Sequence, residues 1–178
     1  MIEGQFGNPP ESYLKTILPV VDVARGLLEK GEELVPIAFV GNFATRKTVQ
    51  VLLDSAGDVE KDRSALAIRM AADMLEADFV FVIMEAWSLR KDKMAQMDAI
   101  LDKYGSIGAS PYRVDVASFG LETRHGVWMA QCEIKPKGIS KKKRTIGAPA
   151  FQYFKEVEGR FSHFLKARPE EDGPATLH

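Results

Sequence analysis

The feature that most constrains this chain is a run of six apolar residues, FVFVIM, at positions 79–84. Successive side chains of a strand point to opposite faces, so a strand of this composition is apolar on both faces. Such strands occur at the centre of a sheet that is covered on both sides. The run is too short to cross a bilayer as a helix, which takes about 20 residues. We therefore expect residues 79–84 to form the central strand of a sheet with helices packed on it.

The segment before this run has the clearest helical pattern in the chain. Asp62 is expected to cap that helix, whose apolar residues recur at helical spacing. The residues expected on its buried face are Ala67, Met70, Ala71, Met74 and Leu75. Further helices are expected at residues 11–30, 92–104 and 154–167. Pro19 should kink or divide the first of these, because proline lacks the N–H that a helix interior needs.

Strand patterns rich in β-branched and aromatic residues occur at residues 34–40, 48–53, 113–122, 127–135 and 145–151. With the helices, they predict one α+β domain over residues 11–167. It should hold a mostly antiparallel or mixed sheet of five to six strands with three to four packing helices. Residues 1–10, with two glycines and two prolines, are expected to be a mobile N-terminal arm. The polar residues 168–178 are expected to be a disordered C-terminal tail.

The composition is that of an ordinary globular domain, with 46% hydrophobic and 28% charged residues. The formal net charge is −1, so any site for a polyanion must be a local patch rather than a global field. Cys132 is the only cysteine, which excludes an internal disulfide and the multi-cysteine metal sites. The first residues lack the basic and apolar regions of a signal peptide. We therefore expect a soluble, cytoplasmic protein.

One segment approaches the phosphate-binding loop, Gly-x-x-x-x-Gly-Lys-Ser/Thr. It is GNFATRKT at residues 41–48. Arg46 stands where the loop needs its second glycine, and the next residues, VQVLLD, predict a strand where the loop needs a helix. A hairpin connection is the better interpretation. The sequence also lacks the histidine patterns of the common zinc hydrolases and the GxSxG pattern of serine hydrolases.

Two of the expected strands, at residues 113–122 and 127–135, form a hairpin that turns near residues 124 and 125. Residues whose numbers add to about 249 should then lie opposite each other, which places Asp115 across from Ile134. We expect the valines on the first strand and Cys132 and Ile134 on the second to face the core. The opposite face should then carry Arg113, Asp115, Glu133 and Lys135.

An aspartate on one strand and Glu133-x-Lys135 on the next resemble the motif of the PD-(D/E)xK nucleases. The resemblance implies that Asp115 and Glu133 hold Mg²⁺ or Mn²⁺ and that Lys135 acts with them in a phosphodiesterase reaction. The sequence departs from the motif at Val114, which stands where the family has proline. The same residues are also explained by cross-strand ion pairs on a solvated sheet face.

Two other residues are candidates by position. Glu85 follows the apolar strand, where burial would raise its pKa and suit it to acid–base catalysis. Its structural alternative is a carboxylate at the rim of the core, paired with an arginine such as Arg69 or Arg90, with Trp87 closing the core. His125 is expected at the tip of the hairpin as an exposed turn residue.

The segment after the hairpin is strongly basic. It carries Lys135, Lys137, Lys141, Lys142, Lys143 and Arg144 within ten residues. These cations could bind phosphates or an acidic partner. No aromatic residue lies among them, so stacking on single-stranded bases is not supported. The alternative is a solvated connection without a partner.

Three functions remain open from the sequence. The first is an accessory or interaction module, with a possible homodimer formed through the aromatic-rich last helix and the kinked first helix. The second is a divalent-metal phosphodiesterase that uses Asp115, Glu133 and Lys135. The third is an anion- or nucleic-acid-binding module that uses residues 135–144.

Overall fold

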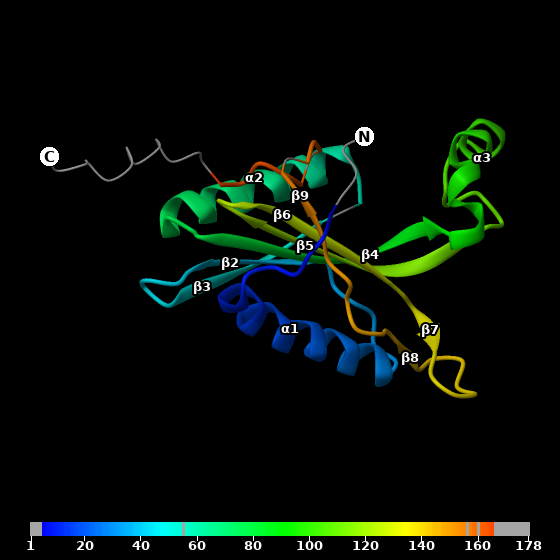
Figure 1. The fold of residues 1–178 in the computed structure, drawn as a ribbon, viewed down its shortest axis with the longest axis horizontal. Helices are drawn as coiled ribbons and strands as arrows, with labels where there is room; N and C mark the ends of the chain where they lie inside the picture. Colours follow the sequence, from blue (N-terminus) through cyan, green and yellow to red (C-terminus); the bar gives the residue numbers. More distant parts are fainter. Residues whose placement is uncertain (1–4, 55, 156, 160, 166–178) are drawn as a thin grey trace, which may run out of the picture.

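The computed structural model describes residues 5–54, 56–155, 157–159 and 161–165. Over these residues the chain forms an α+β fold with a main sheet in the order β1-β9-β6-β5-β4-β2-β3, in which every neighbouring pair is antiparallel (Figure 1). In chain order the elements are β1 (Gln5–Phe6), α1 (Glu11–Glu29), β2 (Ile37–Asn42), β3 (Lys47–Leu52), α2 (Asp58–Leu75), β4 (Phe79–Leu89), the 3₁₀ helix η1 (Lys91–Gln96), α3 (Met97–Tyr104), β5 (Arg113–Thr123), β6 (Gly126–Glu133), β7 (Lys135–Pro136), β8 (Arg144–Thr145) and β9 (Gln152–Phe154).

The predicted central strand is confirmed. The first five residues of β4 are buried, and the strand pairs with β2 on one side and β5 on the other. Its odd-numbered side chains, such as Phe79 and Phe81, belong to the core beneath α1, whereas the even-numbered Val80 and Val82 belong to the core beneath α2. The helices lie on opposite faces of the sheet (Figure 1). A strand that is apolar on both faces is therefore explained by the two layers that cover it.

The first helix, α1, follows its predicted pattern. It begins at Glu11 as predicted, and Gly31 lies just beyond its end with a φ of +85°, the left-handed conformation that glycine adopts readily. Pro19 does not divide the helix, which is continuous over Glu11–Glu29. The buried residues are Tyr13, Ile17, Val21, Ala24 and Leu28, and they pack against the sheet.

The second helix, α2, corrects two predictions. It begins at Asp58, four residues before the predicted cap at Asp62. Its buried face consists of Ser64, Ala65, Ile68 and Ala72, while Met70 and Met74 of the predicted core stripe are exposed. The sequence of α2 holds two apolar stripes at helical spacing, and periodicity alone does not say which one faces the sheet. Apart from Ile68, the side chains that face inward are small.

The predicted hairpin of β5 and β6 is confirmed in register. Val116 lies opposite Glu133 and Thr123 opposite Gly126, so paired numbers add to 249 as expected. The helical pattern at residues 92–104 is present as η1 followed by α3. These lie at the end of the molecule where β4 and β5 extend beyond the other strands (Figure 1).

The C-terminal part differs from its prediction. The strand expected at residues 145–151 is replaced by the short strands β8 and β9, and residues 155, 157–159 and 161–165 form no helix. Gly159 has a φ of +148°, which a helix does not allow. The carboxylate of Glu122 accepts the backbone N–H groups of Phe164 (3.1 Å) and Leu165 (2.8 Å), which fixes this segment over the sheet on the α2 side. Residues 166 and 167 of the predicted helix lie outside the described residues.

The ends of the predicted domain are described in part. Gln5 and Phe6, placed by sequence in the N-terminal arm, form β1 and pair with β9. Residues 1–4 and the predicted tail at 168–178 lie outside the described residues.

Candidate functional site

The register of β5 and β6 separates the two carboxylates of the nuclease-like motif. Residues directly opposite each other in antiparallel strands share a face, so Glu133 shares the α2 side with Val116. Asp115 lies opposite Trp87 of β4, and its carbonyl oxygen accepts the N–H of Ile134 at 2.8 Å. The odd-numbered side chains of β4 face α1, so Asp115, which pairs with Trp87, lies on the α1 side. Paired residues of β5 and β6 have numbers that add to 249, so an odd-numbered residue of one strand always shares its face with an even-numbered residue of the other. Asp115 and Glu133 are both odd-numbered. They therefore lie on opposite faces, and the expectation that they share a face is wrong.

The remaining members of that motif form a weak contact. Lys135 Nζ lies 4.0 Å from Glu133 Oε2, and both side chains are largely exposed. Exposed pairs of this kind contribute little to stability, about 0–1 kcal/mol. Within the described residues, no three histidine, cysteine or carboxylate side chains gather closely enough to hold a metal ion. The geometry therefore gives Asp115, Glu133 and Lys135 no common centre.

Glu85 anchors the basic segment to the sheet. Its Oε1 accepts the N–H of Leu34 (3.1 Å) and a hydrogen bond from Arg144 Nη2 (3.1 Å), while its Oε2 accepts one from Arg144 Nη1 (3.3 Å). The predicted alternative, pairing with an arginine, is present, but the arginine is Arg144. Arg69 lies instead beside the C-terminal segment and Arg90 pairs with Asp92.

Trp87 does not close the core, because its side chain is exposed. The Arg113 guanidinium stacks on its ring, with Cζ 5.2 Å from the ring centroid.

A second set of bonds holds the same segment against the end of α1. We call residues 135–145, which comprise β7, β8 and the loop between them, the basic hairpin. Glu29 accepts hydrogen bonds from Lys137 Nζ (2.9 Å) and Thr145 Oγ1 (2.8 Å), and these bonds lower the pKa of the Glu29 carboxyl. Arg25 donates to the carbonyl oxygens of Ile146 (2.9 Å) and Gly147 (3.1 Å) just after the hairpin. The hairpin is thus fixed to α1 and β4 at its base.

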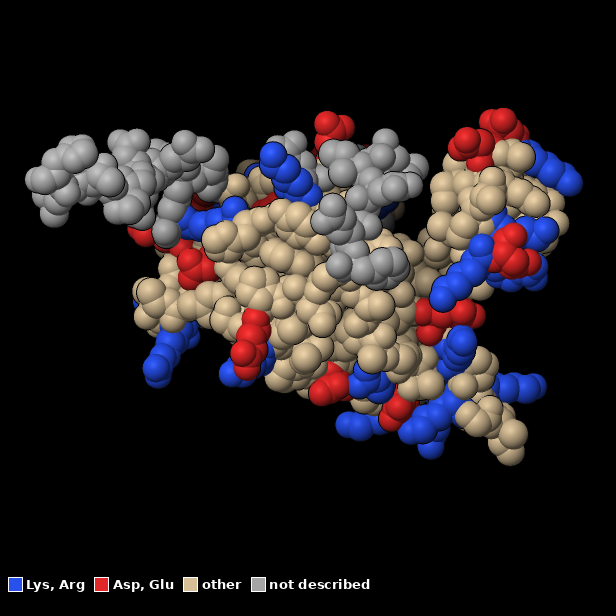
Figure 2. Space-filling model, in the orientation of Figure 1, with Lys and Arg blue, Asp and Glu red and all other residues tan. Residues whose placement is uncertain are grey.

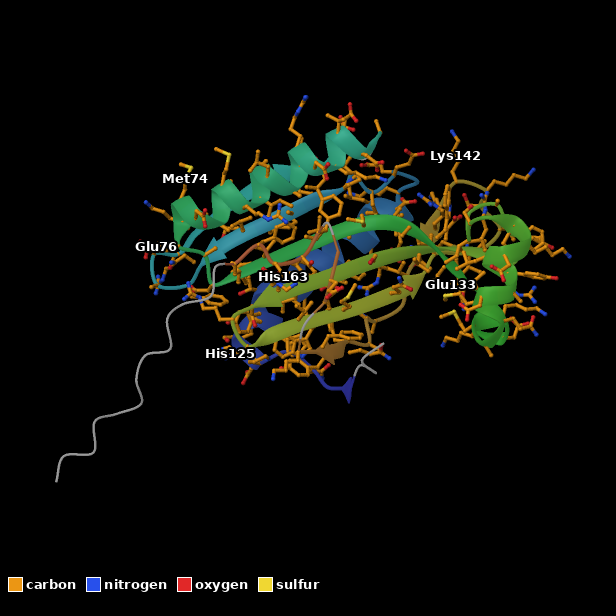
Figure 3. The ribbon with its side chains drawn as sticks, turned by 90° about the horizontal axis from the view of Figure 1, so that it is seen from above. Met74, Glu76, His125, Glu133, Lys142 and His163 are labelled. Carbon is orange, nitrogen blue, oxygen red and sulfur yellow. The ribbon has the colours of Figure 1, made fainter. Side chains whose placement is uncertain are left out.

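The loop of the hairpin presents the cations that remain. Lys141, Lys142 and Lys143 are exposed, and Ser140 Oγ accepts the N–H groups of Lys142 (3.3 Å) and Lys143 (3.1 Å), which shapes the loop. Ile139 beside them is fully exposed. Blue side chains gather around β7 and β8 in Figure 2, and Figure 3 shows Lys142 at the outside of this end. The loop therefore carries three adjacent lysines into solvent on a firmly attached base.

This charge contrasts with the rest of the protein. Residues 135–144 carry six cations and no carboxylate, and the whole chain has a net charge of −1. Subtracting the six leaves −7 for all other residues. A small positive region on an acidic protein localises an anionic partner, because attraction is confined to that region and the remainder repels.

A second candidate site lies on the α2 side of the sheet. Two hollows share Met129: a smaller one of about 150 Å³ beneath the C-terminal segment, and a larger one of about 490 Å³ beside η1. The smaller has an apolar floor around Gly120. The larger is lined partly by Arg90, Lys91 and Glu133. Glu122 in the smaller hollow already binds the backbone of the C-terminal segment through both oxygens. These hollows can accept a ligand, but the described residues that line them form no cluster suited to acid–base catalysis.

The other sequence candidates lie apart. His125 is exposed at the turn between β5 and β6 as expected, at the end of these strands away from Glu133 (Figure 3). Glu85 and Asp115 lie on the α1 side of the sheet and Glu133 on the α2 side. Cys132 is buried, and this burial raises the pKa of its thiol, so it is held in the unreactive protonated form. These side chains do not converge on one cleft.

Sequence reasoning identified the basic segment but missed its anchors. Glu29 is 108 residues from Lys137, and Glu85 is 59 residues from Arg144. No local pattern links residues so far apart. A partial signal was present, since Glu85 was expected to pair with an arginine.

No helix among the described residues is long and apolar enough to cross a membrane. Comparison of the chain with protein-family models, with curated proteins and with solved structures gives no significant match.

Proposed function

We propose that this protein is an interaction module that binds the phosphate backbone of a nucleic acid through Lys141, Lys142 and Lys143 of the basic hairpin. The observation that carries the proposal is that two cations of the hairpin are bound by carboxylates while three others are exposed. Lys137 and Arg144 are bound by Glu29 and Glu85 at its base, so the loop is fixed in place while its three lysines stay exposed.

The exposed cations of the loop are all lysines, whose chemistry is compatible with a phosphate partner. Lysine is a frequent phosphate ligand, and it binds phosphate as a point charge rather than through paired hydrogen bonds. The arginine of the hairpin is already bound to Glu85, which leaves lysines in the loop. Residues 135–145 contain no aromatic side chain, so the hairpin lacks a stacking surface for bases. Binding should therefore depend on the backbone rather than on base sequence.

The test is fluorescence anisotropy with labelled single-stranded and duplex oligonucleotides at several salt concentrations. Replacing Lys141, Lys142 and Lys143 by glutamine should remove about three phosphate contacts. The slope of log K against log salt should then become shallower by about 2 to 3, and binding should weaken to a similar extent for unrelated base sequences.

A matched control removes the same charge elsewhere. Lys47, Lys61 and Lys103 lie on β3, α2 and α3, and their triple glutamine variant has the same change in net charge. It should retain most of the affinity. If the two triple variants bind equally well, the hairpin is not the site.

Two further binding experiments test for other anionic partners. An acidic peptide that binds as tightly as the oligonucleotide, with the same dependence on the three lysines, would replace nucleic acid by an acidic protein. Vesicles with anionic headgroups test a lipid surface, where the exposed Ile139 would insert into the apolar layer. Ile139→Ser should leave oligonucleotide binding unchanged. Vesicle binding that is lost in Ile139→Ser, without oligonucleotide binding, would contradict the proposal.

A further inference from the structure

The outer side of α2 is apolar, although it faces away from the sheet. Relative exposures are 63% for Val59, 55% for Leu66, 57% for Met70 and 83% for Met74. Leu66, Met70 and Met74 are spaced four residues apart, so they form one continuous stripe along the helix. Figure 3 shows Met74 on the side of α2 away from the sheet. Contiguous exposed apolar surface of this kind marks an interaction site, and methionine is frequent in such surfaces.

The stripe has a symmetry that points to its occupant. Leu66 and Met70 lie two residues on either side of position 68, and Arg63 and Asp73 lie five residues on either side of it. If two copies of α2 pack antiparallel about this point, Leu66 of each copy meets Met70 of the other. We propose that this face of α2 binds α2 of a second copy of the chain, as an antiparallel helix pair that forms a homodimer.

Charge distinguishes this arrangement from its alternatives. In the antiparallel pair, each Arg63 faces Asp73 of the other copy, which gives two opposite-charge pairs. In a parallel pair, Arg63 would face Arg63 and Asp73 would face Asp73, which is repulsive. Antiparallel packing also sets the dipole of each helix against the opposite dipole of its partner, which is weakly attractive. These two pairs are complementary to themselves about a two-fold axis, which is what a symmetric dimer requires. Met74 of each copy would lie opposite Asp62 of the other, at the edge of the contact.

The dimer is independent of the proposed anion site. The basic hairpin is anchored to the end of α1, and α1 and α2 lie on opposite faces of the sheet (Figure 1). Each proposal can therefore fail without the other. In a dimer formed through α2, the hairpins of both copies remain exposed.

The first test is sedimentation equilibrium of the full chain over a range of concentrations. The wild type should dimerise reversibly. Met70→Glu should weaken the dimer by at least about tenfold, because it places a charge at the centre of the apolar contact. Met94→Glu, at another exposed methionine on η1, is the matched control and should leave the dimer unchanged. Circular dichroism checks that both variants are folded.

The second test exchanges the charges. Arg63→Asp and Asp73→Arg should each weaken the dimer by roughly tenfold, since each replaces two attractive pairs by two repulsive ones. The double variant should regain most of the affinity, which a purely structural role of either residue would not produce. A wild-type chain that stays monomeric at millimolar concentration overturns the proposal. So does a dimer that Met70→Glu leaves intact.

Discussion

The two sides of the main sheet are built differently, although the same strands supply both. On the α1 side, the helix lays large side chains such as Ile17 and Leu28 onto a continuous core that includes Phe81 and Phe119. On the α2 side, the helix contributes mainly small side chains, and hollows remain on this side beneath the C-terminal segment and beside η1. Close packing on one side and open surface on the other indicate that the α1 side supplies most of the stability. The α2 side is then free to bind.

The difference also explains where the two proposed surfaces lie. The basic hairpin is attached to the well-packed side, where α1 gives it a fixed base through Arg25 and Glu29. The apolar stripe lies on the outside of α2, whose inward face consists of Ile68 and the smaller Ser64, Ala65 and Ala72. Large side chains that would normally fill a core are thereby left at the surface.

The largest expected effect comes from matched truncations of the two helices. Ile17→Ala should lower the free energy of unfolding by about 2–5 kcal/mol, because Ile17 is fully buried and its removal leaves a cavity. Leu66→Ala on the outer face of α2 should change it by less than about 0.5 kcal/mol in the monomer. Urea unfolding at low protein concentration measures both. Equal losses would mean that the outer face of α2 is part of the folded core.

A smaller effect is expected from two strand glycines on opposite faces. A Cβ on Gly41 would lie 2.5 Å from the Phe79 ring, so Gly41→Ala should destabilise the protein by about 1–3 kcal/mol. A Cβ on Gly120 meets no described atom within 4 Å. Gly120→Ala should therefore be neutral or stabilise by about 0.4–1 kcal/mol, since alanine restricts the unfolded chain. Thermal unfolding of the pair measures packing on the two sides, and loss of stability in Gly120→Ala would show that the hollow beneath the C-terminal segment is closed.

The smallest effect concerns the attachment of the hairpin and appears at low pH. The pKa of Glu29 is lowered in the folded protein from its ordinary value of 4.5 by its bonds to Lys137 and Thr145. A lowered carboxyl pKa contributes stability that is complete above the unfolded value and is lost as pH falls through the folded value. The hairpin should therefore loosen below about pH 4. Amide chemical shifts of residues 137–145, followed by NMR from pH 6 to pH 2, should show this transition, and Glu29→Gln should abolish it. A transition that persists in Glu29→Gln would assign the change to another carboxylate.

Local patterns predicted much of the fold and little of the site. The central strand at Phe79 and the register of β5 with β6 follow from composition and turn position, which act over short distances. The register was right, but the face assigned to Glu133 was wrong. The metal centre implied by the nuclease resemblance is therefore not assembled among the described residues. The predicted last helix failed at Gly159, and the apolar residues after it pack on the sheet in a segment without regular secondary structure.

The sequence by itself determined that one strand is covered on both sides, that α1 presents a single apolar stripe, and that residues 135–144 concentrate positive charge. Each of these three features depends on residues that are close together in the sequence, whose spacing determines which face of a helix or strand they occupy. Tertiary structure alone decided which stripe of α2 turns inward and which carboxylates hold the basic hairpin. Those outcomes depend on which segments far apart in the chain meet, because burial and ion pairing are properties of the neighbours that folding brings together.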